Sequence, residues 1–307
     1  MEQVMDMETK QYEISKYMQA ISCLPPRLMR EAMQIPMELT EEAEEIRLRC
    51  GYPLSIVCMG RETSSSGAAV EASELNELLA RASRYSVHSY REDLSRGFLP
   101  LEGGHRLGLC GTIARNGGEI VGYRTLSSVC IRIAREIKGV SDGVYSKVLL
   151  DRRCKNTLII APPGVGKTTM LRDLIRRISL DGIKVGVADE RSELAALCGG
   201  KPQFDLGPCV DVIDGMHKAD AAMRLIRTMS PDVIAMDEIT EEQDLRTIQM
   251  AAHCGVSILA TAHGIDGKDL LRKKLFRDLF KQCMFDRILV MNYVDGKRSL
   301  KVEEMEC

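Results

Sequence analysis

In the C-terminal part of the chain, short apolar runs alternate with segments of helical spacing. Five runs predict β-strands: residues 157–160, 184–188, 232–236, 256–262 and 287–293. The segments between them predict four helices: residues 167–178, 215–229, 241–254 and 268–283. Near-continuous apolar strands separated by helices are typical of a parallel sheet covered on both faces. We therefore expect an α/β fold for this part of the chain.

Local features refine this prediction. Four apolar residues share one face of the second helix: Met216, Ala219, Met223 and Ile226. Gly255 is placed to end the third helix, and the fourth helix is basic and amphipathic. Asp295-Gly296 fits a hairpin turn that leads into a further strand at 299–302.

The N-terminal part of the chain has a mixed pattern. Residues 1–35 read as helix broken by Pro25-Pro26, and residues 73–83 as a helix with Ser73 as its N-cap. Strands are predicted at 43–48, 54–59 and 107–113, with a hairpin partner at 119–123 and a small-residue loop at 63–69. We expect a smaller α+β domain at 1–138, followed by the α/β domain at 139–307.

A glycine-bearing segment joins the strand at 157–160 to the helix at 167–178. Strand, glycine loop, Gly-Lys-Thr and helix form the phosphate-binding loop of nucleoside triphosphatases, in which backbone N–H groups and a helix N-terminus surround the phosphates. We expect ATP and Mg²⁺ as cofactors, with the Lys167 side chain on the phosphates and the Thr168 hydroxyl on the metal. The predicted nucleotide-binding residues are Ala161, Pro162, Pro163, Gly164, Val165, Gly166, Lys167, Thr168 and Thr169. Ala161 stands where the pattern ordinarily has glycine, a change that costs little unless φ is positive there.

Polar residues follow three of the predicted strands. Because ligands bind beyond the carboxyl ends of parallel strands, these residues are candidates for catalysis. Asp237 is expected to hold Mg²⁺, and Glu238 to polarise the attacking water, as in the RecA/AAA+ branch of these ATPases. His263 is placed to sense the γ-phosphate. Glu190 is either a second acidic group near the water or the partner of Arg191 across a subunit boundary.

Composition limits the other possibilities. The 307 residues carry a net charge of −2, only 4% aromatic residues and no Trp. Strong nucleic-acid binders need basic grooves and stacking platforms, so we expect no stable nucleic-acid binding. The 11 Cys are scattered singly, which favours reduced, mostly buried thiols. No apolar stretch approaches the length of a membrane span, and we expect a cytoplasmic protein, held at a membrane at most peripherally through partners.

The segments around these candidate residues resemble a known family. APPGVGKTTMLRDLIR (161–176), VADERSELA (187–195), AMRLIRTMSPDVIAMDEI (222–239), ILATAHG (258–264) and, in the N-terminal part, LSRGFLPLEGGHRLGLCGTI (94–113) are similar to the stage III sporulation protein AA family. The resemblance covers about residues 20–295. Besides Ala161, the chain departs from the expected pattern at Ala188, and neither departure removes a catalytic group.

The resemblance carries further implications. The family belongs with the ATPases of type II and type IV secretion and pilus systems. It implies a RecA-like core, a hexameric ring as homo-oligomer, and membrane channel proteins of a sporulation apparatus as partners. The implied role is a cytoplasmic ATPase of endospore-forming bacteria that works in the mother cell beside a secretion-like channel to the forespore.

Arginines of the N-terminal domain are candidates for catalysis in trans. Arg132 and Arg135 lie in Ile131-Arg132-Ile133-Ala134-Arg135, with Arg106 further upstream. Either they form a solvated polar face, or one of them enters the nucleotide site of an adjacent subunit, as arginine fingers do. The sequence does not choose among the three.

Three functions are compatible with the sequence. The leading one is an oligomeric ATP-hydrolysing motor of a secretion-type apparatus. The alternatives are an ATP-dependent nucleic-acid translocase, which the basic segment 272–277 keeps open, and a nucleotide-gated scaffold that barely hydrolyses ATP.

Overall fold

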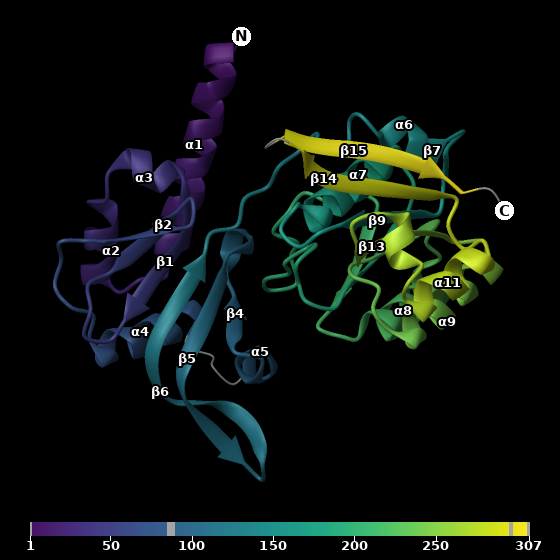
Figure 1. The fold of residues 1–307 in the computed structure, drawn as a ribbon. Coiled ribbons are helices and arrows are strands. Elements are labelled where there is room, and N and C mark those ends of the chain that lie inside the picture. Colours follow the sequence, from purple (N-terminus) through teal and green to yellow (C-terminus); the bar gives the residue numbers. More distant parts are fainter. Residues whose placement is uncertain (1, 85–89, 295–296, 306–307) are drawn as a thin grey trace. The chain divides into compact units, whose positions relative to one another are not determined.

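The protein is described by a computed structural model that covers residues 2–84, 90–294 and 297–305. The chain forms two compact units (Figure 1): Met1–Arg135 together with Leu197–Gln203, and Glu136–Ala196 together with Phe204–Cys307. The predicted domain boundary, between residues 138 and 139, stays a prediction. The first unit ends close to that point, at Arg135, but it also takes up a short segment from the middle of the chain.

The first unit is built on an antiparallel sheet of six strands in the order β3-β2-β1-β6-β5-β4. The strands are β1 (Ala43–Arg49), β2 (Ser55–Cys58), β3 (Arg61–Ser64), β4 (Phe98–Pro100), β5 (Arg106–Asn116) and β6 (Glu119–Arg132). The helices are α1 (Glu2–Ile21), α2 (Pro26–Met33), α3 (Met37–Glu41), α4 (Ala72–Ala82) and α5 (Arg91–Ser95). Alternate strand residues such as Ile46 and Leu48 are fully buried, together with Leu28 of α2 and Leu75 of α4. This is an α+β unit with its own core.

Three local predictions for this unit need correction. The N-cap of α4 is Glu71, whose side chain forms a capping box with Glu74, so Ser73 lies inside the helix. The predicted loop at 63–69 is partly β3, since Arg61–Ser64 pair with β2. The hairpin of β5 and β6 is longer than expected, because its pairing continues through several bulges to Asn116 and Glu119.

The second unit contains a seven-stranded sheet in the order β11-β10-β12-β13-β9-β14-β15. Its strands are β9 (Thr157–Ala161), β10 (Val185–Asp189), β11 (Val210–Asp214), β12 (Val233–Met236), β13 (Ser257–His263), β14 (Arg287–Val294) and β15 (Lys297–Glu304). All neighbours are parallel except the last pair, β14 and β15. A short hairpin, β7 (Leu149–Leu150) with β8 (Arg153–Cys154), and helix α6 (Tyr145–Val148) precede the sheet.

Helices cover both faces of this sheet. They are α7 (Lys167–Leu180), α8 (Lys218–Met229), α9 (Glu242–His253), α10 (Gly267–Leu270) and α11 (Lys274–Lys281). One set of alternate strand residues, such as Ile160 and Ile258, packs with α8, α9 and α11 in a single core. The opposite set, such as Ile159 and Leu259, is equally buried, and α7 lies against β9, β10 and β13. The predicted parallel α/β fold is confirmed.

The details of the second unit differ from the pattern in three places. The predicted helix at 268–283 is two short helices, α10 and α11, separated by residues 271–273. The edge strand β11 was not predicted, because its half-buried residues include Asp211 and Asp214. Of the predicted helix face, Ala219 is fully buried in α8, whereas the other most buried apolar residues of this helix are Ala221, Ala222 and Leu225. The hairpin turn predicted at Asp295-Gly296 lies outside the described residues.

The cysteines are less buried than expected. Among the described residues, nine cysteines are free thiols, of which Cys50, Cys110 and Cys254 are exposed. Cys283 is disulfide-bonded, so the expectation of reduced thiols is wrong at this residue. Among the described helices, none is both long and apolar enough to cross a bilayer.

Candidate functional site

The glycine-bearing loop lies between β9 and α7, as its sequence predicts. Gly164 and Gly166 have φ angles of +79° and +101°, values that residues with a side chain rarely adopt. Gly166 is the N-cap of α7. Ala161 is an ordinary strand residue: it is fully buried, pairs with His263 of β13 and has no positive φ. The loop geometry therefore does not require glycine at that position.

Lys167, the first residue of α7, places its ammonium inside this loop. Its Nζ atom lies 3.3 Å from the carbonyl oxygen of Ala161, 3.4 Å from that of Pro162 and 2.9 Å from Nδ1 of His263. Burial lowers the pKa of Lys167, while the carboxylates of Asp237 and Glu238 act in the opposite direction. The ammonium thus lies next to the peptide groups that would surround a phosphate.

Asp237 follows β12 and accepts hydrogen bonds from two hydroxyl groups. Thr168 Oγ1 of α7 donates to Asp237 Oδ2 at 3.0 Å, and the hydroxyl of Thr261, in β13, donates to Asp237 Oδ1. Carboxylate and hydroxyl oxygens are the ligands that Mg²⁺ prefers, so the predicted metal pair, Thr168 and Asp237, fits this ion in chemistry and in position. Thr261 was not predicted; its signal is a hydroxyl within the buried, otherwise apolar middle of β13.

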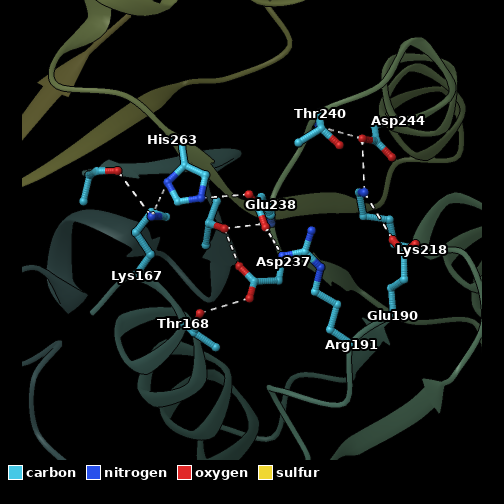
Figure 2. A network of polar contacts seen from close by, with 12 residues as sticks. Lys167, Thr168, Glu190, Arg191, Lys218, Asp237, Glu238, Thr240, Asp244 and His263 are labelled. Carbon is cyan, nitrogen blue, oxygen red and sulfur yellow. Dashed lines mark hydrogen bonds and ion pairs between the residues drawn. The ribbon is translucent and has the colours of Figure 1, made fainter. Parts of the chain in front are cut away.

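Glu238 has both of its carboxylate oxygens engaged (Figure 2). Oε1 lies 2.8 Å from Nε2 of His263, and Oε2 accepts a hydrogen bond from Nη1 of Arg191 at 2.5 Å. The backbone of Glu238 has a φ of +52°, a left-handed conformation that is energetically unfavourable for residues other than glycine. The backbone N–H of Glu238 donates to Thr261 Oγ1 at 2.8 Å, which supports this conformation. The side chain of Glu238 is therefore the centre of a network drawn from three strand ends.

His263 ends β13 and connects the two halves of the site. One ring nitrogen contacts the ammonium of Lys167 and the other the carboxylate of Glu238. A neutral imidazole with its proton on Nε2 satisfies both contacts, because Lys167 then donates to Nδ1 and Nε2–H donates to Glu238. The structure brings together five predicted residues: Lys167, Thr168, Asp237, Glu238 and His263.

Glu190 belongs to a second cluster in the same unit (Figure 2). Its carboxylate lies 3.3 Å from Nζ of Lys218, which is itself 3.5 Å from Asp244 Oδ2. Burial acts to raise the pKa of Glu190, but the charge and hydrogen bonds of Lys218 together with the nearby His217 outweigh it, and the pKa lies below its ordinary value. Arg191, the next residue, pairs with Glu238 and not with Glu190. Lys218 was not predicted, since a lysine at a helix start ordinarily faces solvent.

The segment that carries Glu190 and Arg191 is anchored by Asp189. This carboxylate is buried and accepts the backbone N–H groups of Glu193, Leu194 and Ala195. Burial raises the pKa of Asp189, although the three N–H groups favour its charged form. Behind the segment, Arg172 of α7 donates to the carbonyl oxygens of residues 193 and 194. The turn after β10 is thus held from both sides.

The three candidate arginines of the first unit have partners within that unit. Arg132 is largely exposed and lies 3.2 Å from the carboxylate of Glu45. Arg135 pairs with Glu13 and donates to the carbonyl oxygen of Glu41 at 2.6 Å. The guanidinium of Arg106 stacks 3.6 Å from the ring centre of Phe98. Of the three arginines, Arg132 is the most exposed to solvent.

Comparison with known proteins identifies similar chains. Residues 12–302 match the family described as "Sporulation stage III, protein AA". The stage III sporulation protein AA of Bacillus subtilis is 36% identical over 285 residues, which cover 91% of this chain and 92% of the relative. Among solved structures, the pilus retraction motor PilT with bound ADP is 18% identical, with a TM-score of 0.57 over 89% of this chain and 81% of that one. The Yersinia pseudotuberculosis ATPase DotB is 15% identical, with a TM-score of 0.57 over 91% and 79%. These two likenesses show the fold, which is RecA-like.

Proposed function

The chain belongs to the sporulation stage III protein AA family, and from this membership and the site geometry we propose that it is a Mg²⁺-dependent ATPase, the motor of a secretion-type apparatus. The observation that carries the proposal is the contact between Thr168 and Asp237 directly beside the Lys167 ammonium. A metal-bound triphosphate requires a hydroxyl group, a carboxylate and a lysine close to one glycine-bearing loop.

Each residue of the site has a task in this proposal. The loop from Ala161 to Thr169 surrounds the phosphates, and Lys167 binds the β- and γ-phosphate oxygens. Thr168 and Asp237 hold Mg²⁺, which neutralises charge on the transferred phosphoryl group when it is bound. His263 lies beside Lys167 and is positioned to respond to the γ-phosphate.

Glu238 is the proposed base that orients the attacking water. It directly follows Asp237, a proposed metal ligand, and contacts His263. Glu190 is the weaker candidate, because its carboxylate is paired with the buried ammonium of Lys218.

The proposed motor is a homo-oligomer, with a hexameric ring as the expected form and a cytoplasmic location beside membrane channel proteins. The family membership supports a role in endospore formation, in the mother cell at a channel to the forespore. An arginine from a neighbouring subunit would complete the site. Arg132 is the first candidate because its side chain is 70% exposed, whereas the Arg135 side chain is only 24% exposed.

Turnover and nucleotide binding of single variants test the enzyme assignment. Lys167→Ala should abolish ATP binding, while Glu238→Gln should retain binding and lose turnover by about 10²-fold or more. Glu190→Gln is the matched comparison and should retain most activity, and Lys274→Ala, an exposed lysine of α11, should behave as wild type. ATP binding without turnover in the unmodified protein would instead favour a nucleotide-gated scaffold.

Mixing experiments test the oligomeric part of the proposal. Turnover per subunit should rise with protein concentration as rings form. Arg132→Ala subunits should bind ATP normally and recover turnover when mixed with Lys167→Ala subunits, since each supplies what the other lacks. A dilute monomer with concentration-independent turnover would contradict the ring, and mass measurement with and without ATP gives the oligomeric state directly.

A further inference from the structure

We propose that Thr261 is a positioning residue of the nucleotide site, whose hydroxyl fixes the direction of the Asp237 carboxylate and the backbone of Glu238 at the same time. The proposal rests on the function proposed above, in which Asp237 holds Mg²⁺ and Glu238 is the base. It assigns the orientation of both acidic residues to one buried threonine of the neighbouring strand.

Thr261 lies in the strand that separates the two parts of the site. This strand, β13, pairs on one side with β12, which leads to Asp237, and on the other side with β9, which leads to the glycine-bearing loop. Because side chains alternate along a strand, Thr261 shares a sheet face with Leu259, the face against which α7 lies. Helix α7 carries Thr168 in its first turn. The Thr261 hydroxyl is therefore on the side of the sheet where Asp237 and Thr168 meet.

The hydroxyl of Thr261 makes two hydrogen bonds, one as donor and one as acceptor. It donates to Oδ1 of Asp237 and accepts the backbone N–H of Glu238 at 2.8 Å. A hydroxyl has a single hydrogen, so its donor capacity is fully used by Asp237. Thr261 is completely withdrawn from solvent. Loss of the hydroxyl would therefore leave two polar groups of the site without a partner that they now share.

The bond to Asp237 sets how this carboxylate faces the expected metal. With Oδ1 held by Thr261, the other oxygen, Oδ2, accepts the hydroxyl of Thr168 at 3.0 Å. The carboxylate is thus held by a strand on one side and by a helix on the other, and it cannot rotate without losing a hydrogen bond. Removal of a group that orients a metal ligand in this way typically lowers metal affinity by about 10–100-fold.

The bond from Glu238 acts on the backbone of the proposed base. The regular pairing of β12 with β13 ends at Met236 and Ala260, and the chain then turns at Glu238, where φ is +52°. The Glu238 N–H bonds to the Thr261 side chain, and the next N–H, of Ile239, bonds to the Thr261 carbonyl oxygen at 2.8 Å. An unfavourable φ persists only where the surroundings fix it, and here one residue supplies both acceptors.

The shape of threonine makes the proposal testable by small changes. Valine has the same branched shape and the same preference for a strand, but it can neither donate nor accept a hydrogen bond. Serine keeps the hydroxyl and lacks only the methyl group. A comparison of Thr261→Val with Thr261→Ser therefore separates the hydrogen bonds of the residue from its packing.

The Mg²⁺ concentration needed for nucleotide binding tests the proposal without turnover. When binding of a non-hydrolysable ATP analogue is titrated with Mg²⁺, Thr261→Val should raise the half-saturating Mg²⁺ concentration roughly tenfold. Thr261→Ser should stay within about twofold of wild type, since it keeps both hydrogen bonds. The thiol of Thr261→Cys is a weak donor and acceptor, so this variant should shift in the same direction as Thr261→Val, and it replaces Thr261→Val if valine prevents folding.

Thr247→Val is the matched control. Thr247 of α9 is also buried, but its hydroxyl donates to the carbonyl oxygen of Gln243 within the same helix, at 3.2 Å. Its loss should leave the Mg²⁺ requirement unchanged, whatever it does to stability.

The possible outcomes separate the role of Thr261 from the ATPase assignment. An unchanged Mg²⁺ requirement in Thr261→Val and Thr261→Cys would overturn the proposal, and so would a shift in Thr261→Ser as large as that in Thr261→Val. In a wild type that turns over ATP, these results leave the ATPase assignment standing. A tenfold shift in Thr261→Val of a protein without turnover would support the role of Thr261 while refuting the ATPase assignment. Analogue binding by the wild type that is independent of Mg²⁺ would overturn both.

Discussion

The ammonium of Lys218 lies 3.5 Å from a carboxylate oxygen of Asp244, and both side chains are almost completely withdrawn from solvent. The same carboxylate oxygen accepts the backbone N–H groups of Thr240 and Glu241 at 2.9 and 3.0 Å. Lys218 begins α8, whereas Asp244 lies in the first turn of α9 after the Glu238 segment. The ammonium of Lys218 therefore connects the start of α8 with the start of α9 and, through Glu190, with the end of β10.

Loss of the Lys218 charge should destabilise the second unit. Lys218→Met leaves Asp244 and Glu190 without their cation, and breaking a buried ion pair in this way costs about 3–5 kcal/mol. Thermal or urea unfolding would measure the loss. Lys274→Met is the matched control, because the pair of Lys274 and Glu242 is exposed on both sides and should cost less than about 1 kcal/mol. Equal effects of the two substitutions would contradict the importance of the buried pair.

His105 should make the first unit sensitive to acid. Burial, with a smaller contribution from Lys16, lowers the pKa of His105 to about 4, and its Nδ1 accepts the backbone N–H of Ala134 at 3.0 Å. In the unfolded chain the pKa of His105 is about 6.5. The contribution of His105 to the free energy of unfolding is therefore fully present above that pH, and it is lost as the pH falls toward 4. The loss should reach about 3 kcal/mol, at about 1.4 kcal/mol per pH unit.

Unfolding between pH 4.5 and 7.5 would check this dependence. The comparison with His105→Gln isolates the histidine, since an amide oxygen can still accept a hydrogen bond but does not titrate. The difference in unfolding free energy between wild type and variant should shrink or reverse at low pH. A difference that is the same at every pH would show that His105 does not carry the effect.

Ala161 should tolerate the residue that the phosphate-loop pattern ordinarily has. Since Ala161 lies within β9 and has no positive φ, Ala161→Gly should leave nucleotide affinity unchanged. It should lower stability by about 0.5–1 kcal/mol, because glycine loses more conformational freedom on folding. Nucleotide titration and thermal unfolding of the same preparation give both numbers. Tighter nucleotide binding in the variant would mean that the alanine distorts the loop.

Arg132 and Arg135 should differ in their effect on stability. Arg135→Ala removes the half-buried contacts with Glu13 and the Glu41 carbonyl oxygen and should cost about 1–3 kcal/mol. Arg132→Ala removes an exposed contact and should cost less than about 1 kcal/mol. Unfolding measurements would show whether a lost turnover in either variant reflects catalysis or misfolding. A strongly destabilised Arg132→Ala would remove it as a candidate for action in trans.

The sequence predicts most of the second unit because its strands are buried on both faces. The runs at 157–160 and 256–262 have no polar face, so their apolar continuity marks a central parallel strand directly. The edge strand β11 has half-buried residues with Asp211 and Asp214 among them, and such a pattern does not differ from a loop. The break between α10 and α11 depends on tertiary contacts. Lys273 Nζ donates to the His263 carbonyl oxygen, and composition alone does not show this contact.

The same limit applies to the candidate site. Lys167 and Thr168 are predictable because their spacing in one loop carries the chemistry. The contact between Arg191 and Glu238 joins residues 47 positions apart and depends on which strands are neighbours in the sheet. Lys218 could not be predicted for the same reason, since its two carboxylate partners come from the turn after β10 and from the first turn of α9. Residue types were therefore foreseeable, whereas the pairs that hold them were not.

The segment Leu197–Gln203, which belongs to the first unit, has a consequence for dissecting the protein. The side chain of Gln203 accepts a hydrogen bond from the backbone N–H of Gly103 at 2.7 Å, so this segment is held by a residue that is distant in sequence. The polypeptide passes between the units three times, after Arg135, after Ala196 and after Gln203. No single cut, by a protease or in the gene, separates them. A fragment that starts at Glu136 would contain the segment Leu197–Gln203 without the first unit to which it belongs. To produce the second unit alone, a short linker should replace residues 197–203.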